Sequence, residues 1–598
     1  EKDGAEVPLG GAASQLGFER ALYVFDDTSP TISSSIIVEE NVLHEDNNSI
    51  TKADLGIPNS SNDDVVRETY LKWLRGVDLK DSNNDNSTSD YRLQMGDPIH
   101  SKPIVVDYGE SGTSILISTN QGMIHSFDSE NGKENFAIMP KSLLTNVDHF
   151  YNDSSTLNHV YGIDGDLVLR EYGNNKYLYA GMRRGGRNYY VFDVTTKDTP
   201  TLKFIIKGGD TGFEKLGQTW SRPVFTKVKI GTVDKNVMIF GGGYSEGHDD
   251  RILRSTDSIG NAIFMVDAET GNLLWSAGMT GAVDLELSDM KYSIPASISV
   301  IDRDNDGYAD HMYAADLGGQ LFRLDIYNGE STENLVAGSL IADFGGDTED
   351  SNRRFFYAPN VSEIALADEL YYGVAVGSGW RASPLDTSVQ DKFYMLKDTE
   401  VFKRDEDGKY KFFEDAVVES DLFDATNHAL TSDNESERGI AASNIANKKG
   451  WLLDLGGSGE KVLAAPLIID YKILFTTYMP SINNESACAP PEGNSRAYLV
   501  NLFNANAVRD INNDGLLQNS DRSVDLSQPG IAPEPGIFIQ DEPIVCIGTE
   551  CASAVIEEDE DGNPQACTSP FGCLSENILG RYERVRRGSW HSETEREQ

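Results

Sequence analysis

The first hundred residues and the rest of the chain differ in how apolar and polar positions alternate. Near the start, polar runs surround one helical pattern, in which two acidic residues precede apolar side chains three or four positions apart: Asp63, Asp64, Val66, Tyr70, Trp73 and Leu74. This spacing predicts one helix that packs beside the main domain. After Met95 the chain changes to short apolar runs separated by Gly, Asn and Asp, which is typical of an all-β fold.

One strand-and-turn pattern recurs in this second region. An aromatic or aliphatic strand ends in Asp and a short turn follows; the clear copies are residues 123–128, 189–193, 262–267 and 321–325, and weaker ones lie at 393–396 and 497–501. The final Asp residues of the clear copies are 65, 74 and 58 residues apart. Compact propeller repeats take roughly 40 to 50 residues, so the spacing indicates blades with insertions.

We therefore predict an all-β fold, a quinoprotein-like β-propeller of about seven blades with inserted loops and a small N-terminal helical or irregular segment. Residues 1–90 would pack on or lead into the propeller. Residues 91–598 would form the propeller, with long insertions and a cysteine-containing C-terminal part. The alternative is a β-sandwich or two stacked barrels whose strands are similar by chance.

The sharpest chemical signal is an acidic loop at residues 302–310. Positions 1, 3, 5 and 9 are carboxylates, position 6 is Gly307, and the carbonyl of position 7 is a further oxygen donor; the predicted ligands are Asp302, Asp304, Asp306, Tyr308 and Asp310. Oxygen donors at this spacing indicate Ca²⁺, which would neutralise carboxylates that otherwise repel one another. Position 12 is Tyr313 instead of an acid, so we expect modest affinity. The alternative is a solvated acidic turn.

A second loop has the same spacing nearer the C-terminus. Its predicted Ca²⁺ ligands include an acid at position 12, and they are Asp510, Asn512, Asp514, Leu516 through its carbonyl, and Asp521. The alternative is a turn rich in Asx residues. Two other acidic turns, residues 405–408 and 559–562, lack the later ligands, and the first is interpreted as a hairpin turn.

Charge excludes one large class of partner. The 598 residues carry 96 acidic and 51 basic side chains, a net charge of −45, so nucleic acid would be repelled. No apolar stretch approaches the roughly 20 residues of a membrane helix. The chain begins without a signal peptide or Met, so we expect a processed or excised piece that lacks upstream domains.

The five cysteines all lie in the last fifth of the chain: Cys488, Cys546, Cys551, Cys567 and Cys573. None forms the CxxC pair of a zinc site, so we expect two disulfide bridges in an exported protein, with a pairing that the spacing leaves open.

Catalytic motifs are missing. There is no Gly-x-Ser-x-Gly elbow, and Gly241-Gly242-Gly243 is not followed by the Lys-Ser/Thr of a phosphate loop. A quinone-dependent dehydrogenase also combines a propeller with calcium, but it would need adjacent cysteines, which this sequence lacks. We predict that the chain is not an enzyme. A structural surface or filament component stays open as an alternative function.

Several segments resemble the PilC/PilY family of type IV pilus adhesins in order and spacing. They are residues 96–103, 216–223, 240–244, 293–296, 302–310, 315–325 and 586–590, of which 302–310 with 315–325 is the most specific. The resemblance covers residues 73–590. The family's von Willebrand A-like module is absent from this chain.

The resemblance implies a function outside the cell. It predicts a calcium-binding adhesin and assembly factor at the pilus tip or the outer surface of a bacterium, which supports pilus biogenesis, the balance of extension and retraction, and surface attachment. It also implies that the acids of the first loop are the regulatory ligands, and that the partners are minor pilins of the pilus tip and a host or abiotic surface.

Overall fold

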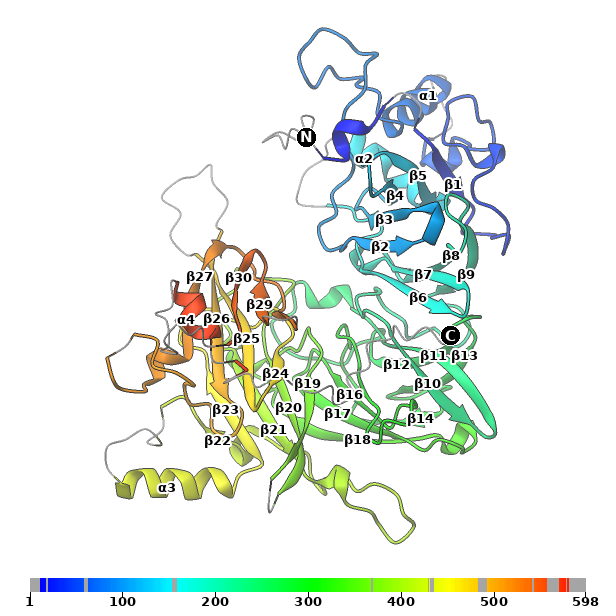
Figure 1. The fold of residues 1–598 in the computed structure, drawn as a ribbon. Coiled ribbons are helices and arrows are strands. Elements are labelled where there is room, and N and C mark those ends of the chain that lie inside the picture. The colour runs from blue at the N-terminus through cyan, green and yellow to red at the C-terminus, as the bar shows by residue number, and fades with distance from the viewer. Residues whose placement is uncertain are drawn as a thin grey trace.

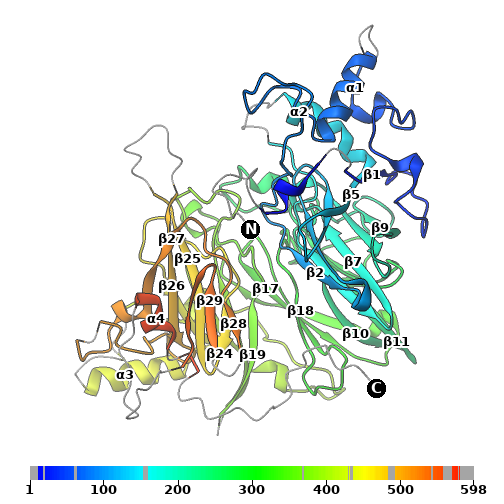
Figure 2. The same ribbon diagram turned by 45° about the horizontal axis from the view of Figure 1, so that its top comes forward.

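The computed structural model describes residues 11–17, 20–58, 63–152, 159–366, 369–427, 430, 435–481, 492–512, 514–539, 543–555, 569–576 and 578–579. Within these residues the strands form seven sheets, which we number in chain order. Figures 1 and 2 show the sheets following one another along the chain. The predicted β-propeller is confirmed, and six of its sheets have four or five strands while the seventh has three.

The first three sheets occupy the N-terminal half of the chain. Sheet 1 contains β1 (Leu22–Phe25), β2 (Ile104–Asp107), β3 (Thr113–Ser118), β4 (Ile124–Asp128) and β5 (Glu134–Pro140). Sheet 2 contains β6 (Leu167–Tyr172), β7 (Asn175–Gly181), β8 (Asn188–Asp193) and β9 (Thr201–Lys207). Sheet 3 contains β10 (Val224–Ile230), β11 (Val233–Gly241), β12 (Ala262–Asp267), β13 (Leu273–Gly278) and β14 (Leu285–Glu286).

The other four sheets follow. Sheet 4 contains β15 (Ser299–Ile301), β16 (His311–Ala315), β17 (Gln320–Ile326) and β18 (Val336–Asp343). Sheet 5 contains β19 (Asn360–Ala365), β20 (Leu370–Gly377), β21 (Lys392–Asp398), β22 (Phe423–Asp424) and β23 (Gly450–Asp454). Sheet 6 contains β24 (Leu467–Ile469), β25 (Lys472–Met479), β26 (Asn494–Asn501) and β27 (Ser523–Pro529), and sheet 7 contains β28 (Gly536–Phe538), β29 (Ile544–Ile547) and β30 (Glu550–Ser553).

The recurring sequence pattern is the third propeller strand of sheets 1 to 6. Its six copies coincide with β4, β8, β12, β17, β21 and β26. The turn after β12 shows why Asp and Gly recur there. The side chain of Asp267 accepts hydrogen bonds from the amides of Glu269 and Thr270, and Gly271 has a φ of 76° that favours glycine.

Apolar side chains fill the space between consecutive sheets. Separate buried clusters lie between sheets 1 and 2, 2 and 3, 3 and 4, 4 and 5, 5 and 6, and 6 and 7. Each sheet thus completes the core of its neighbour, as propeller blades must, because one blade cannot bury both of its faces alone.

The predicted N-terminal helix is confirmed as α1 (Asp63–Leu74). It buries Tyr70 and Leu74, and its Tyr70 and Trp73 rings pack on Tyr151 at the end of α2 (Val147–Tyr151). Strand β1 joins sheet 1 by pairing parallel to β5. The other helices are α3 (Glu435–Ala446) and α4 (Pro570–Ser575), and no described helix has the length and apolarity that a membrane span requires.

Candidate functional site

The first acidic loop connects β15 to β16 in sheet 4. Two of its residues have left-handed backbone, Asn305 with a φ of 62° and Gly307 with a φ of 91°. Asn and Gly accept this conformation more readily than other residues. They curl the chain tightly, so that side chains on both sides of the turn approach each other.

Three carboxylates of the loop come together. Asp302, Asp304 and Asp310 each offer one oxygen, and these oxygens all lie within 4.8 Å of one another. In the described part of the chain this is the one group of three His, Cys, Asp or Glu side chains with ligand atoms so close. A set of carboxylate oxygens suits a hard divalent cation such as Ca²⁺. The fourth predicted acid, Asp306, is exposed and instead accepts a hydrogen bond from the amide of Tyr308 at 2.9 Å.

Backbone amides hold these carboxylates in place. Asp302 accepts hydrogen bonds from the amides of Asp306 at 3.2 Å and Gly307 at 2.8 Å. Asp310 accepts one from the amide of Arg303 at 2.8 Å, which joins the two ends of the loop. The side chains are therefore ordered before any cation binds, which lowers the entropy cost of binding.

The charges of the loop oppose one another. Burial raises the pKa of Asp310, the Arg303 amide opposes this, and the charges of Asp304 and Asp306 raise the pKa further. A bound divalent cation would remove this repulsion. The hydroxyl of Tyr308, whose carbonyl is the fifth predicted ligand, forms a hydrogen bond with Asp234 that raises the pKa of the hydroxyl.

A buried charged network lies beside the end of the loop, and no sequence motif marks it. His311, the first residue of β16, has Nδ1 2.7 Å from Asp325 Oδ1. Arg323 bridges Asp325 to Asp398 of sheet 5, with Nη1 2.8 Å from Asp398 Oδ2, and Tyr313 donates to the same oxygen at 2.8 Å. All five side chains are fully buried. The network therefore links the loop to the boundary between sheets 4 and 5.

The second acidic loop connects β26 to β27 in sheet 6, and its hydrogen bonds repeat those of the first loop. The amide of Asp514 donates to Asp510 at 3.3 Å and to Asn512 at 2.9 Å. The amide of Gly515 donates to Asp510 at 2.7 Å, and the amide of Leu516 donates to Asp514 at 2.8 Å. Two loops about 200 residues apart in sequence thus adopt the same hydrogen-bonded turn.

Asp521, the residue predicted at position 12, lies in the short 3₁₀ helix η15 (Asn519–Arg522) and is 1% exposed. One of its oxygens accepts a hydrogen bond from the amide of Gln518 at 2.8 Å. Its Oδ1 is buried and has no hydrogen-bond partner among the described residues. The acids of this loop do not form a triple as close as that of the first loop.

The remaining sequence predictions concern turns and cysteines. Residues 405–408 form a turn closed by a bridge between Arg404 and Tyr410, as expected for a hairpin, and residues 559–562 lie outside the described part. Cys546 and Cys551 form a disulfide across the β29–β30 hairpin. Cys573 is also disulfide-bonded, while Cys488, Cys567 and the matching segment 586–590 lie outside the described residues.

Three comparisons relate this architecture to known proteins. The family model of the PilY1 beta-propeller domain matches residues 89–367. The type IV pilus biogenesis factor PilY1 of Pseudomonas aeruginosa strain PAO1 is 23% identical over 587 residues, which cover 86% of this chain and 46% of that protein. A PilY1 homolog of Xylella fastidiosa is 23% identical over 507 residues, which cover 76% of this chain and 32% of that protein.

This chain thus spans less than half of the length of each of these two relatives. The crystal structure of the P. aeruginosa PilY1 C-terminal domain matches with a TM-score of 0.50 and 19% identity, covering 74% of this chain and 93% of that domain. This likeness supports the propeller fold. The resemblance to the PilC/PilY family is therefore confirmed, and the model of the PilY1 beta-propeller domain accounts for residues 89–367 of this chain.

Proposed function

We propose that this chain is the calcium-binding propeller of a type IV pilus biogenesis factor that acts at the pilus tip or the outer surface of a bacterium. Its relatives are named as type IV pilus biogenesis factors. We infer a non-enzymatic role: support of pilus assembly, control of extension against retraction, and attachment to a surface. Minor pilins of the pilus tip and a host or abiotic surface are the proposed partners.

The convergence of Asp302, Asp304 and Asp310 is the observation that carries this proposal. In the proposed site the three carboxylates hold one Ca²⁺, joined by Asp306 and the carbonyl of Tyr308. The loop joins two strands of sheet 4, and the network from His311 to Asp398 continues from it into sheet 5. Binding would therefore order one end of sheet 4 and stiffen its boundary with sheet 5.

The second loop supplies an additional proposed site, with Asp510, Asn512, Asp514, the carbonyl of Leu516 and Asp521 as ligands. The unpartnered buried oxygen of Asp521 supports this assignment, because a cation would compensate its lost hydration. One donor of this set is a neutral amide, so the site carries less negative charge than the first and would bind Ca²⁺ more weakly.

Calorimetric titration of Ca²⁺ into chelator-treated protein tests the proposal. We expect two sites with dissociation constants on the order of 10⁻⁴ to 10⁻³ M or tighter. Asp304→Ala should remove one site and Asp510→Ala the other. The matched control is Asp407→Ala, which removes an exposed acid from the 405–408 turn and should keep both sites. Absence of binding by the wild type, or unchanged affinity in Asp304→Ala, would show that the loops are ordinary acidic turns.

A second experiment separates calcium binding from the role in pili. A bacterium that produces this protein would be given the Asp304→Ala form, and its surface pili would be counted alongside cells with the Asp407→Ala form. We expect fewer pili or an altered balance of extension and retraction in the first strain alone. If calorimetry shows a lost site but the pili are unchanged, calcium binds and the regulatory role is wrong.

A further inference from the structure

A cluster of arginine and aromatic side chains lies at the opposite end of the sheets from the two acidic loops. Its members follow or precede strands at that end: Arg183 comes after β7, Trp220 before β10, Tyr244 after β11 and Arg381 after β20. The acidic loops begin where β15 and β26 end, and in these antiparallel sheets that is the other face. A face rich in guanidinium groups is unexpected in a chain with a net charge of −45.

Aromatic rings form the base of this cluster. The ring of Trp220 stacks on that of Tyr244, with centroids 4.4 Å apart, and Phe356 lies 5.9 Å from Trp220. Tyr244, Leu317, Phe356 and Trp380 form a buried apolar core that draws on sheets 3, 4 and 5. Residues from separate blades therefore meet at one rigid platform.

Two guanidinium groups on this platform are connected to one carboxylate, Arg183 directly and Arg381 through His100. Arg183 lies over the Trp220 ring at 4.2 Å, and its Nε is 3.7 Å from Asp164, which is fully buried. Arg381 has Nη2 3.3 Å from Nε2 of His100, whose Nδ1 is 2.9 Å from the same Asp164. The Nε atoms of Arg183 and Arg381 are buried and have no hydrogen-bond partner among the described residues.

Two neighbouring arginines are fully paired with carboxylates. Arg184 makes two hydrogen bonds to Asp249, at 2.9 and 3.1 Å, and Arg251 donates to Asp257 at 2.7 Å. By contrast, no carboxylate of the described residues forms an ion pair within 4.0 Å with Arg381 or with Arg354, which stacks on Trp380 at 4.0 Å. Arg354 and Arg381 therefore lack the direct carboxylate contact that Arg184 and Arg251 have, although for Arg354 burial lowers the pKa and the charges of Asp391 and Asp386 raise it.

The pKa shifts within the cluster show how its charges affect one another. Burial lowers the pKa of Arg183, Tyr357 opposes this, the charge of Arg381 lowers it further, and the charges of Asp164 and Asp166 raise it. Burial also lowers the pKa of His100; Asp164 opposes this, and the charges of Arg183 and Arg381 lower it further. These cations disfavour one another's charge, so an added anion would stabilise the group.

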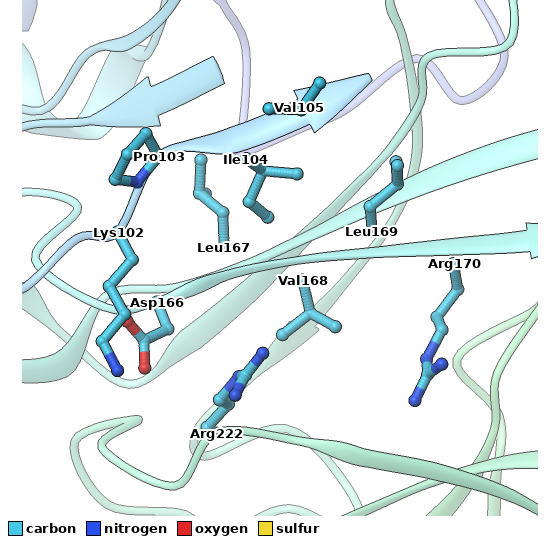
Figure 3. A pocket seen from close by; sticks show the side chains of 10 residues that line it. All are labelled: Lys102, Pro103, Ile104, Val105, Asp166, Leu167, Val168, Leu169, Arg170 and Arg222. Carbon is cyan, nitrogen blue, oxygen red and sulfur yellow. The ribbon is translucent and has the colours of Figure 1, made fainter. Parts of the chain in front are cut away.

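A cleft with basic side chains lies close to His100 and Asp164 in the sequence. Its first lining residues, Lys102 and Asp166, come two positions after them. It lies between β2 and β6, has a volume of 430 Å³, and is lined by Lys102, Pro103, Ile104, Val105, Asp166, Leu167, Val168, Leu169, Arg170 and Arg222. Figure 3 shows these side chains arranged around the opening. Of its three cations, Lys102 is paired with Glu534, so Arg170 and Arg222 with the single acid Asp166 give the cleft a weakly positive character.

We propose that Arg183 and Arg381 bind the carboxylate or phosphate group of a small anionic ligand at this arginine platform. Guanidinium groups match both oxyanions through paired N–H donors. His100 positions Arg381 by accepting its hydrogen bond, and Asp164 in turn holds His100. The body of the ligand extends into the cleft beside Ile104 and Leu167.

Calorimetry with two probes, succinate and inorganic phosphate, tests this site on the full chain at pH 7 in low salt without calcium. Binding of succinate alone assigns a carboxylate ligand, binding of phosphate alone assigns a phosphate ligand, and binding of both assigns a general oxyanion site. Arg183→Gln and Arg381→Gln should each weaken binding about tenfold or more, because each removes a charge-assisted hydrogen bond. Arg438→Gln on the exposed face of α3 makes the same charge change and should have no effect.

Two further measurements keep the outcome clear. Circular dichroism checks that the variants fold. Arg183 packs on Trp220, and if Arg183→Gln proves unstable for that reason, the wild-type titration decides the outcome. If the wild type binds neither probe up to about 10 mM, or if a folded Arg381→Gln binds as tightly as the wild type, the proposal is wrong. Asp304→Ala should keep anion binding, so failure of this site is distinct from failure of the calcium sites.

Discussion

Arg323 is a single buried side chain that compensates the charge of two buried carboxylates. Its guanidinium is fully buried between Asp325 and Asp398, which belong to different sheets. Burial lowers the pKa of Arg323, but the two carboxylates outweigh that effect and raise it. The arginine therefore stays charged, and its loss would leave two carboxylates in the core without a cation.

Replacing Arg323 by Met should destabilise the protein by about 3 to 5 kcal/mol, because the remaining buried carboxylates would be uncompensated. The free energy of unfolding, measured in urea, checks this. Lys291→Met is the control, since Lys291 pairs with Asp289 at 3.2 Å and these side chains are 42% and 50% exposed, so the expected cost is under about 1 kcal/mol. Equal costs for the two variants would contradict the role given to the buried network.

At the residue scale, the acidic loop can be located from the sequence because its acids lie within nine positions. Their spacing predicts that four carboxylates converge, and three of them do, while calcium binding stays a prediction. Arg381 and His100 are 281 residues apart, and they come into contact only because the fold brings separate blades together. No local periodicity encodes such a pair, and the arginine platform therefore could not be predicted from the pattern of the chain.

Among the elements, the third strand of each of the first six sheets was predictable because its chemistry is local. Apolar alternation sets the strand, and the final Asp with a following Gly sets the turn. Strands β1, β14 and β22 were not foreseen. Each is only two to four residues long and joins an outer edge by parallel pairing, which depends on distant partners rather than on its own pattern.

The two acidic loops allow a prediction at the element scale, because they share one turn and differ in one donor. Asn512 occupies the place that Asp304 has in the first loop. Asn512→Asp adds a carboxylate to the donor set, so the second site should bind Ca²⁺ roughly tenfold more tightly, as measured by calorimetry. Asn504→Asp adds the same charge near the loop but outside the donor set. If both variants tighten binding equally, general charge rather than coordination explains the effect.

Across the whole molecule, the boundary between the end and the start of the sheet array differs from the others. Buried apolar clusters join each sheet to the next from sheet 1 to sheet 7. Among the described residues, polar contacts join the beginning of β2 to the later part of the chain: Lys102 pairs with Glu534 at 2.8 Å, and His100 meets Arg381. Half-exposed ion pairs contribute little, so the pair of Lys102 with Glu534 adds little to the stability of this boundary.

Net charge should dominate how salt affects the folded state. With 96 acidic and 51 basic side chains, the compact chain repels itself more than the unfolded chain does. Screening should therefore raise the melting temperature by a few degrees as NaCl increases from about 0.01 to 0.2 M, where the screening length falls below about 10 Å. Exposed ion pairs such as Lys102 with Glu534 act in the opposite sense, because salt weakens them, but each is worth under about 1 kcal/mol.

Differential scanning calorimetry in the presence of a chelator measures the net of these two contributions, since the chelator removes free Ca²⁺. If screening causes the rise, the melting temperature should level off above about 0.2 M NaCl, because screening saturates there. A rise caused by salting-out would continue at higher salt. A melting temperature that falls with salt would mean that ion pairs, including that of Lys102 with Glu534, outweigh the repulsion of 45 excess negative charges. In that case local ion pairs, rather than the net charge of the chain, would dominate the response of the folded state to salt.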